Sequence, residues 1–201
     1  VDPGFRPDGA VAVRLTPPNG RYEGESVTFF YDEVRRAAES SPEIESAGAI
    51  LFLPMTPGGA WSSYHPPGAA TAEGNLPTTA FRIVTPGYLE TMEVDRVAGR
   101  YLDEGDGADA EAVAVINRTL ARHAFRSPDP VGRVLVLGRA GTDTVRVVGV
   151  VDDVRQSDLR TDVFPELYRP LAQQPMNRLY MVARASNDPG RALVALHDAV
   201  R

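Results

Sequence analysis

The chain has 201 residues, of which 43% are hydrophobic, 7% aromatic and 24% charged, a composition that supports a folded core and disfavours intrinsic disorder. The formal net charge is −6 and all 21 basic residues are scattered arginines, so neither nucleic acid nor an anionic membrane surface is an expected partner. Cysteine is absent, which excludes disulfides, thiolate metal sites and cysteine nucleophiles.

The first fifty residues predict a strand, an amphipathic helix and a second strand. The strands are expected at residues 11–15 and 44–53. Between them, apolar residues recur at helical spacing after Ser26, which is the expected N-cap. Such a βαβ unit predicts that its two strands lie parallel or flank a third strand, with the helix on one face.

Residues 54–77 are dense in Pro, Gly, Ser and Ala and predict a long loop. Loops of this length in compact domains usually carry a function or move. The segment contains Trp61, Tyr64 and His65, which are the candidate contacts with a partner or substrate. The alternative is that Trp61 packs onto its own domain, because tryptophan side chains are largely buried on average.

The middle of the chain, residues 78–162, predicts short strands separated by turns. Pro86 is expected at the first position of a short helix, and Asn117 is expected to cap another. A Gly- and Asp-rich turn between the last two strands predicts a hairpin. The strands are expected at residues 78–84, 97–102, 113–116, 133–137 and 144–151.

The last part of the chain predicts strands at residues 166–170 and 178–184 and then a helix. Asp188 is the expected N-cap of that helix and Pro189 its first residue. This strand and helix resemble the opening strand and helix, so the end of the chain is interpreted as a second βαβ half without its closing strand. The predicted fold class is α+β.

One acidic cluster invites comparison with a calcium site. It lacks the alternating ligands and the closing bidentate Glu of an EF-hand, so a solvated loop is expected. The cluster consists of Asp103, Glu104, Asp106, Asp109 and Glu111.

The remaining polar residues form no catalytic or metal-binding motif. Asp152 and Asp153 are adjacent, and adjacent residues on a strand point to opposite faces, so they are not expected to share a substrate. His65, His123 and His197 have no partner at metal-ligand spacing. No nucleophile elbow or phosphate loop is present. The sequence therefore predicts no catalytic residue, no metal ligand and no cofactor site.

A set of motifs occurs in a defined order: VDPGFRPDG, PEIESAGA, VTPGYLETMEVDRVAGRYLDEGD, AVAVINRTLARHAF, DPVGRVLVL, VRVVGVVDDVRQSDLR and ELYRPLAQQP. This ordered set covers nearly the whole chain and resembles the MacB-like periplasmic core domain of bacterial ABC transporter permeases. It is most similar to the large permeases that carry two such domains and no fused ATPase.

The resemblance implies two lobes. A porter-like lobe would combine residues 1–53 with residues 163–201, and a β-rich lobe would be inserted at residues 78–162, after the loop at 54–77. The resemblance also implies transmembrane helices before Val1 and after Arg201, so the two ends of the chain should lie on the same side of the molecule.

The resemblance further implies a noncatalytic, extracytoplasmic domain of a bacterial inner-membrane permease. Such a domain couples ATP-driven motion of membrane helices to substrate export or to the action of a periplasmic partner. The implied partners are an ABC ATPase subunit, reached through the membrane region, a periplasmic protein, and a second subunit in a permease dimer.

Two alternatives remain from the residues themselves, and both place function in the segment at 54–77. The first is a freestanding secreted enzyme or ligand-binding module, which a deep pocket with convergent polar groups beside Trp61, Tyr64 and His65 would favour. The second is a pure interaction module that docks a periplasmic partner through the same segment.

Overall fold

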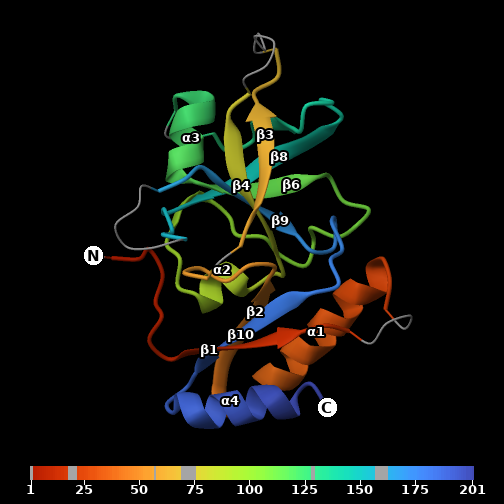
Figure 1. The fold of residues 1–201 in the computed structure, drawn as a ribbon, viewed down its shortest axis with the longest axis vertical. Helices are drawn as coiled ribbons and strands as arrows, with labels where there is room; N and C mark the ends of the chain where they lie inside the picture. The colour runs from red at the N-terminus through yellow and green to blue at the C-terminus, as the bar shows by residue number, and fades with distance from the viewer. Residues whose placement is uncertain (1, 18–21, 57, 69–75, 128–129, 157–162) are drawn as a thin grey trace.

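The computed structural model describes residues 2–17, 22–56, 58–68, 76–127, 130–156 and 163–201 (Figure 1). Its helices are α1 (Glu25–Glu39), α2 (Tyr88–Thr91), α3 (Arg118–Phe125) and α4 (Pro189–Asp198). Its strands are β1 (Ala10–Leu15), β2 (Ile44–Ile50), β3 (Ala60–His65), β4 (Thr78–Val84), β5 (Arg96–Gly99), β6 (Val113–Asn117), β7 (Val134–Leu137), β8 (Asp143–Val151), β9 (Glu166–Pro170) and β10 (Leu179–Ala185). The predicted α+β class is confirmed.

The ten strands of this described part form one sheet in the order β1-β10-β2-β4-β3-β7-β8-β6-β9, with β5 paired to β8. At one end, β1 and β2 flank β10, and both run antiparallel to it, so β1 and β2 are parallel to each other. This confirms the predicted βαβ unit, whose strands flank a third. α1 and α4 lie against this end of the sheet, in the lower part of Figure 1.

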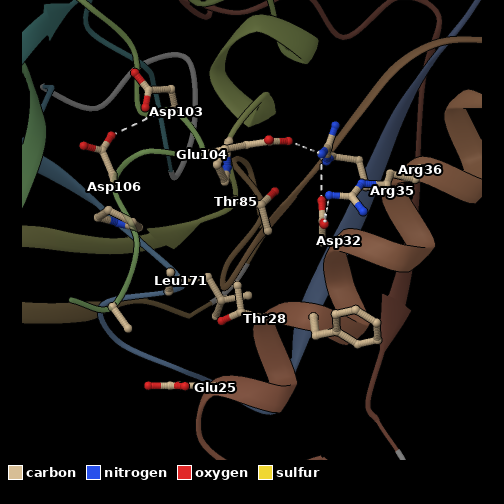
Figure 2. A pocket seen from close by; sticks show the side chains of 15 residues that line it. Glu25, Thr28, Asp32, Arg35, Arg36, Thr85, Asp103, Glu104, Asp106 and Leu171 are labelled. Atoms are coloured by element: carbon tan, nitrogen blue, oxygen red, sulfur yellow. Dashed lines mark hydrogen bonds and ion pairs between the residues drawn. The ribbon is translucent and has the colours of Figure 1, made fainter. Parts of the chain in front are cut away.

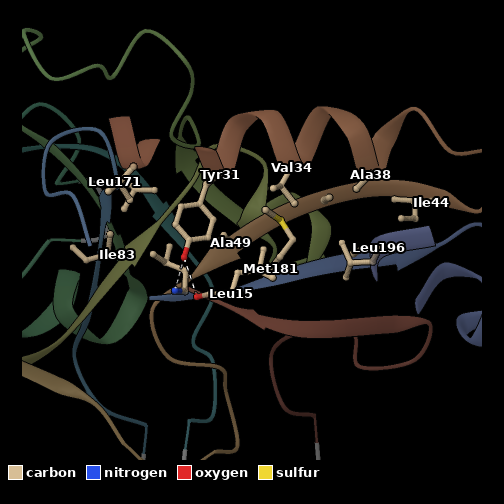
Figure 3. Close-up of a cluster of buried hydrophobic side chains, with 14 of the residues drawn as sticks. Leu15, Tyr31, Val34, Ala38, Ile44, Ala49, Ile83, Leu171, Met181 and Leu196 are labelled. Carbon is tan, nitrogen blue, oxygen red and sulfur yellow. Dashed lines mark hydrogen bonds between the residues drawn. The ribbon is translucent and has the colours of Figure 1, made fainter. Parts of the chain in front are cut away.

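A core cluster fills the space between these two helices and the strands β1, β10 and β2 (Figure 3). Val27, Tyr31, Val34 and Ala38 recur along α1 at intervals of three or four residues, and all four are buried. α4 adds Leu196, which is fully buried. Burial of each large side chain of this kind contributes about 1.5–3 kcal/mol, so this contact fixes both helices on the sheet.

The Tyr31 hydroxyl completes the end of the β1–β10 ladder. Leu15 and Leu179 are register partners, and the hydroxyl lies between their backbone groups. It accepts a hydrogen bond from the Leu179 N–H at 2.9 Å and donates to the Leu15 carbonyl at 3.1 Å (Figure 3). Burial raises the pKa of Tyr31 to about 12, although the hydrogen bond from Leu179 lowers it. The phenol is therefore neutral and bridges two backbone groups that would otherwise lack partners.

Six strands close into a ring in the order β4-β3-β7-β8-β6-β9. The ring closes because β9 pairs with β4 in parallel as well as with β6 in antiparallel orientation. Each ring strand contributes side chains to one shared cluster of buried or partly buried residues, among them Phe81, Ile116 and Leu135. Closure reduces the free strand edge of the ring, which limits strand pairing with other chains. The predicted hairpin is confirmed as β7–β8.

β3 corrects the sequence prediction for residues 54–77. The segment is not a continuous loop, because Ala60–His65 pairs with β4 and then with β7. Its sequence, AWSSYH, lacks the β-branched residues that favour strands, and glycines and prolines surround it. Pairing partners far away in the sequence therefore override the local composition.

The helix starts are confirmed in part. The Asn117 side chain accepts from the Leu120 N–H at 2.8 Å, and the Asp188 side chain accepts from the Gly190 N–H at 2.8 Å, so both predicted caps are present. Ser26 is not the N-cap of α1, since Gly24 holds that position. Pro86 is not the first residue of α2, which begins at Tyr88.

The lobe boundaries drawn from the resemblance stay a prediction. β9, allotted there to the porter-like lobe, pairs with the ring strands β4 and β6. In Figure 1 the C-terminal end lies at the bottom beside α4 and the N-terminal end lies at mid-height, so both are away from the upper tip of the ring. Among the described residues, no helix combines the length and apolar character that a bilayer crossing requires.

Replacement of Tyr31 by phenylalanine tests the bridging hydroxyl. Tyr31→Phe leaves the Leu179 N–H buried without a partner, so we expect the free energy of unfolding to fall by about 1–3 kcal/mol. Urea denaturation followed by circular dichroism measures the change. Tyr180→Phe on β10 is the matched control and should change stability by less than about 0.5 kcal/mol. Equal effects of the two substitutions would contradict the bridge.

Candidate functional site

The three residues singled out in the 54–77 segment lie along β3 but do not converge. Trp61 is 54% exposed, and its ring stacks edge-on against Phe164, with the centroids 5.4 Å apart. Tyr64 is buried in the ring core, and burial raises its pKa. His65 is half-buried, and its Nδ1 lies 3.0 Å from the Pro66 carbonyl oxygen. Of the three, Trp61 offers the largest exposed surface.

A buried ion pair lies near Trp61. Arg82 Nε on β4 donates to Glu166 Oε1 on β9 at 2.6 Å, and both side chains are at most 5% exposed. The other carboxylate oxygen accepts from the Tyr168 hydroxyl at 2.6 Å and from Gln156 Nε2 at 3.0 Å. Burial and the nearby Glu166 charge raise the pKa of Tyr168 well above its ordinary value. Both oxygens of the carboxylate therefore have partners, and the bond to Arg82 joins β9 to β4.

This pair could not be predicted from the sequence, for a physical reason. Arg82 and Glu166 are 84 residues apart, and only the parallel pairing of β4 with β9 brings them together. The available signal was weak: each is a charged residue inside a short strand whose other residues are mostly apolar or aromatic. Charges that are fully buried need a partner, so two such positions predict each other.

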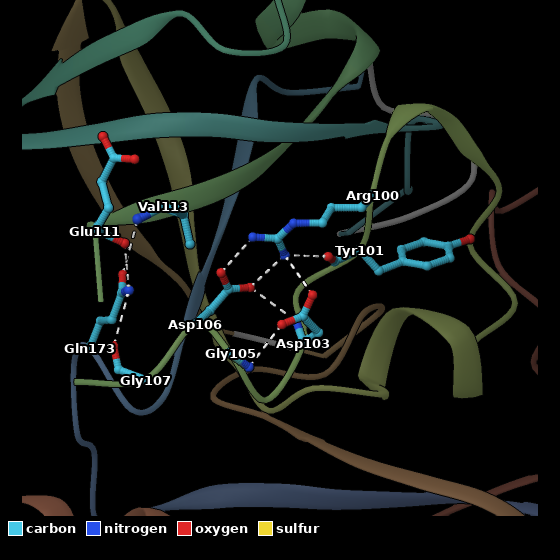
Figure 4. A network of polar contacts seen from close by, with 9 residues as sticks. All are labelled: Arg100, Tyr101, Asp103, Gly105, Asp106, Gly107, Glu111, Val113 and Gln173. Carbon is cyan, nitrogen blue, oxygen red and sulfur yellow. Dashed lines mark hydrogen bonds and ion pairs between the residues drawn. The ribbon is translucent and has the colours of Figure 1, made fainter. Parts of the chain in front are cut away.

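The acidic loop is ordered rather than fully solvated, which corrects the sequence prediction for Asp106. That side chain is only 5% exposed and forms a bidentate ion pair with Arg100, at 2.7 and 2.8 Å (Figure 4). It also accepts from the Asp103 N–H at 2.9 Å. Although burial alone would raise it, the pKa of Asp106 is lowered because Arg100 and the Asp103 amide stabilise the carboxylate.

Gln173 fixes the other end of the same loop. Its Nε2 donates to the carbonyl oxygens of Glu111, at 2.9 Å, and Gly107, at 3.3 Å, and its Oε1 accepts from the Val113 N–H at 3.1 Å (Figure 4). Gln173 follows β9, so a residue from a distant segment ties down the return into β6. The loop is thus held at both ends.

A cleft of about 390 Å³ separates this loop from α1 (Figure 2). We call it the α1 cleft. One wall is the face of α1 that runs from Glu25 to Arg36, and the other is the loop at residues 103–108. Thr85, Pro86 and residues 170–172 complete the lining. Arg35 on α1 reaches Glu104 in the loop at 2.9 Å. Among the lining residues, this single ion pair therefore joins the two walls of the cleft.

The other candidate groups have structural roles. The Asp153 carboxylate accepts from the Thr119 N–H and Oγ1, both at 2.9 Å, at the start of α3, where a negative charge is favourable. Asp152 pairs with Arg118 at 2.9 Å. Across the described residues, no group of three or more His, Asp or Glu side chains is placed to hold a metal ion.

The family model for the MacB-like periplasmic core domain matches residues 4–199 of the chain. The periplasmic region of MacB from Actinobacillus actinomycetemcomitans is similar with a TM-score of 0.62 and 13% identity, over 97% of this chain and 83% of that chain. The extracellular domain of the noncanonic ABC-type transporter YknZ from Gram-positive bacteria is similar with a TM-score of 0.57 and 15% identity, over 94% and 93%. At these identities the likeness shows the fold alone. No curated protein matches the sequence significantly.

Asp106→Asn tests the ordered loop. Loss of the charged pair with Arg100 should lower the free energy of unfolding at pH 7 by about 1–3 kcal/mol. Because the pKa of Asp106 is lowered by folding, its stabilisation is present above the ordinary value of 3.8 and is lost as the pH falls below it. The difference between variant and wild type should therefore shrink between pH 5 and pH 2, roughly. Asp109→Asn, in the exposed part of the same loop, is the control and should match the wild type.

Trp61→Ala separates a contact surface from a structural anchor. The substitution removes the ring pair with Phe164, worth about 0.5–1.5 kcal/mol, and the burial of only about half of the ring, so we expect a smaller loss of stability than at a fully buried aromatic residue. Tyr64→Ala on the same strand removes a buried ring and should cost about 3 kcal/mol or more. Thermal and urea denaturation compare the two. If Trp61→Ala lowers stability as much as Tyr64→Ala, Trp61 is a structural anchor of its own domain and not mainly a contact surface.

Proposed function

This chain belongs to the family of MacB-like periplasmic core domains, and on that premise we propose that it is the extracytoplasmic domain of an ABC-type permease. The observation that carries the proposal is the family match over residues 4–199, which leaves almost no part of the chain for another module. The periplasmic and extracellular domains of two transporters share its fold. A periplasmic or extracytoplasmic location follows from the same premise.

The domain acts mechanically and makes or breaks no bonds. ATP hydrolysis by an ABC ATPase subunit moves the membrane helices, and the domain passes that motion to substrate export or to a periplasmic partner. The continuous sheet supports this role. Strands β1, β10 and β2 join the ring through the Ile50–Val84 pair between β2 and β4, so a displacement of either part is transmitted through hydrogen-bonded strands.

The exposed Trp61–Phe164 pair is the surface we assign to a periplasmic protein partner. Two aromatic rings that are 54% and 38% exposed form a contact surface with little side-chain entropy to lose. The alternative of a freestanding enzyme or ligand-binding module on the same segment has less support, since Tyr64 is buried in the ring core and cannot converge with Trp61 on a ligand. A permease dimer would bring two such surfaces together in one assembly.

Motion of the domain above the membrane tests the coupling role. The chain contains no cysteine, so the substitution Arg139→Cys on the β7–β8 turn places a single donor label in this domain. The substitution is made in the complete permease. The permease is reconstituted with its ATPase in vesicles whose lipid headgroups carry an acceptor. We expect the donor to move by about 5 Å or more between the nucleotide-free and ATP-bound states, the size of a one-turn shift.

An ATPase variant that binds but does not hydrolyse ATP provides the control, since it should hold the ATP-bound distance and stop cycling. The same donor-to-bilayer distance in every nucleotide state would refute mechanical coupling by this domain.

A further inference from the structure

The α1 cleft combines an apolar floor with an acidic rim. The partly exposed side chains of Pro86 and Ala172 line it, and Phe29 at its wall is 56% exposed although it is a large aromatic residue. Thr28, also in the wall, has a buried hydroxyl oxygen without a hydrogen-bond partner among the described residues. An exposed aromatic side chain next to a concave apolar surface is typical of a binding site.

The rim of the cleft carries an excess of negative charge. Five of its lining side chains are carboxylates, and two are the guanidinium groups of Arg35 and Arg36. Arg100, which pairs with Asp106 from behind the loop, brings the number of positive charges to three. Arg35 is already shared among three carboxylates, at 2.7 to 3.0 Å, and Arg36 pairs with Asp32 at 2.6 Å. Both arginines therefore already have carboxylate partners. The formal net charge of −6 adds a long-range attraction for cations.

Glu104 and Glu25 are the acceptors that a visiting cation can reach. The Glu104 side chain is 70% exposed, and its contact in the cleft is the single ion pair with Arg35. Glu25 is exposed at the start of α1 on the same cleft (Figure 2). Arg35 keeps Asp32 and Glu39 when Glu104 turns to a new partner. The exchange therefore leaves no buried charge without a counter-ion.

We propose that the α1 cleft binds a lysine or arginine side chain, together with an adjoining apolar side chain, from a segment of a partner polypeptide. The cationic group binds Glu104, Glu25 attracts it from the other end of the cleft, and the apolar side chain packs against the exposed ring of Phe29. A volume of about 390 Å³ accommodates a few side chains and not a folded domain, so the ligand is a short segment. This binding role is separate from the coupling role and from the Trp61–Phe164 surface, and its failure would leave both untouched.

A peptide titration of the 201-residue chain tests the proposal. The probe is acetyl-Leu-Arg-Leu-amide, and the readout is the shift of backbone amide signals in ¹⁵N nuclear magnetic resonance spectra. We expect the largest shifts in residues 25–36 and 103–108. The same peptide with glutamine in place of arginine should bind at least about fivefold more weakly, and the affinity for the arginine peptide should fall as salt rises.

Substitutions locate the site. The double variant Glu25→Gln and Glu104→Gln should weaken binding of the arginine peptide about fivefold or more, and Phe29→Ala should weaken both peptides. Glu45→Gln removes an exposed carboxylate on β2, away from the cleft, and serves as the matched control. Spectra of the free variants show that each is folded.

Three results would overturn the proposal. One is equal affinity for the arginine and glutamine peptides. Another is a set of shifts that lies outside the two cleft walls. The third is an effect of Glu45→Gln as large as that of the double variant, since this would reveal attraction to the net charge of the chain and not to the cleft.

Discussion

The shared strand β4 is the constraint on which the rest of the architecture depends. It closes the six-stranded ring by pairing with β3 and β9, and it touches β2 through Ile50 and Val84. The Arg82–Glu166 pair spans the parallel β4–β9 contact, which is where the ring closes. Removal of one partner from such a buried pair leaves an uncompensated charge, which is far more costly than the net value of the pair. The ion pair therefore acts mainly on register, because any slip of β9 against β4 would separate the two charges.

A second buried arginine ties the beginning of the chain to the same framework. Arg184 on β10 donates to the carbonyl oxygens of Thr91, Asp8 and Arg6 at 2.8 to 2.9 Å. Two segments that are remote from β10 and from each other in sequence are thus fixed to one guanidinium. α2 also lies close to β2, since a Cβ on Gly48 would come within 2.5 Å of the Tyr88 backbone. The lead-in to β1 and the helix α2 consequently follow any movement of β10 and β2.

Most local features of the sequence were predictable, although the helix starts expected at Ser26 and Pro86 were wrong, and contacts between distant segments were not predictable. The Asn117 and Asp188 caps and the β7–β8 hairpin were found because each depends on residues within a few positions of one another. β3 was missed because its stability comes from β4 and β7 and not from its own composition. The order of the acidic loop was missed because a carboxylate beside glycines gives no sign that Arg100 will bury Asp106.

The same distinction applies to the candidate sites. Trp61 could be singled out from the sequence, since an aromatic residue among glycines and prolines is unusual, but its pairing with Phe164 could not. The α1 cleft left no local signal at all. Its walls are 60 to 80 residues apart, roughly, and each alone resembles a solvated helix face or an exposed turn. A cleft between elements from different parts of a chain becomes visible only once the fold is known.

The position of the α1 cleft links binding to the geometry of the domain. α1 is fixed by the core cluster that contains Tyr31 and Val34. The acidic loop is anchored by Leu102 and Val113, which belong to a separate buried cluster that includes Val84 of β4. A ligand that contacts both walls binds best at one spacing of the two clusters, so a change in that spacing must change its affinity. By reciprocity, an occupied cleft favours the spacing that it fits, with a coupling free energy equal in both directions. Under the mechanical role that we propose, a binding site between two cores is therefore also a point at which a partner can bias the motion.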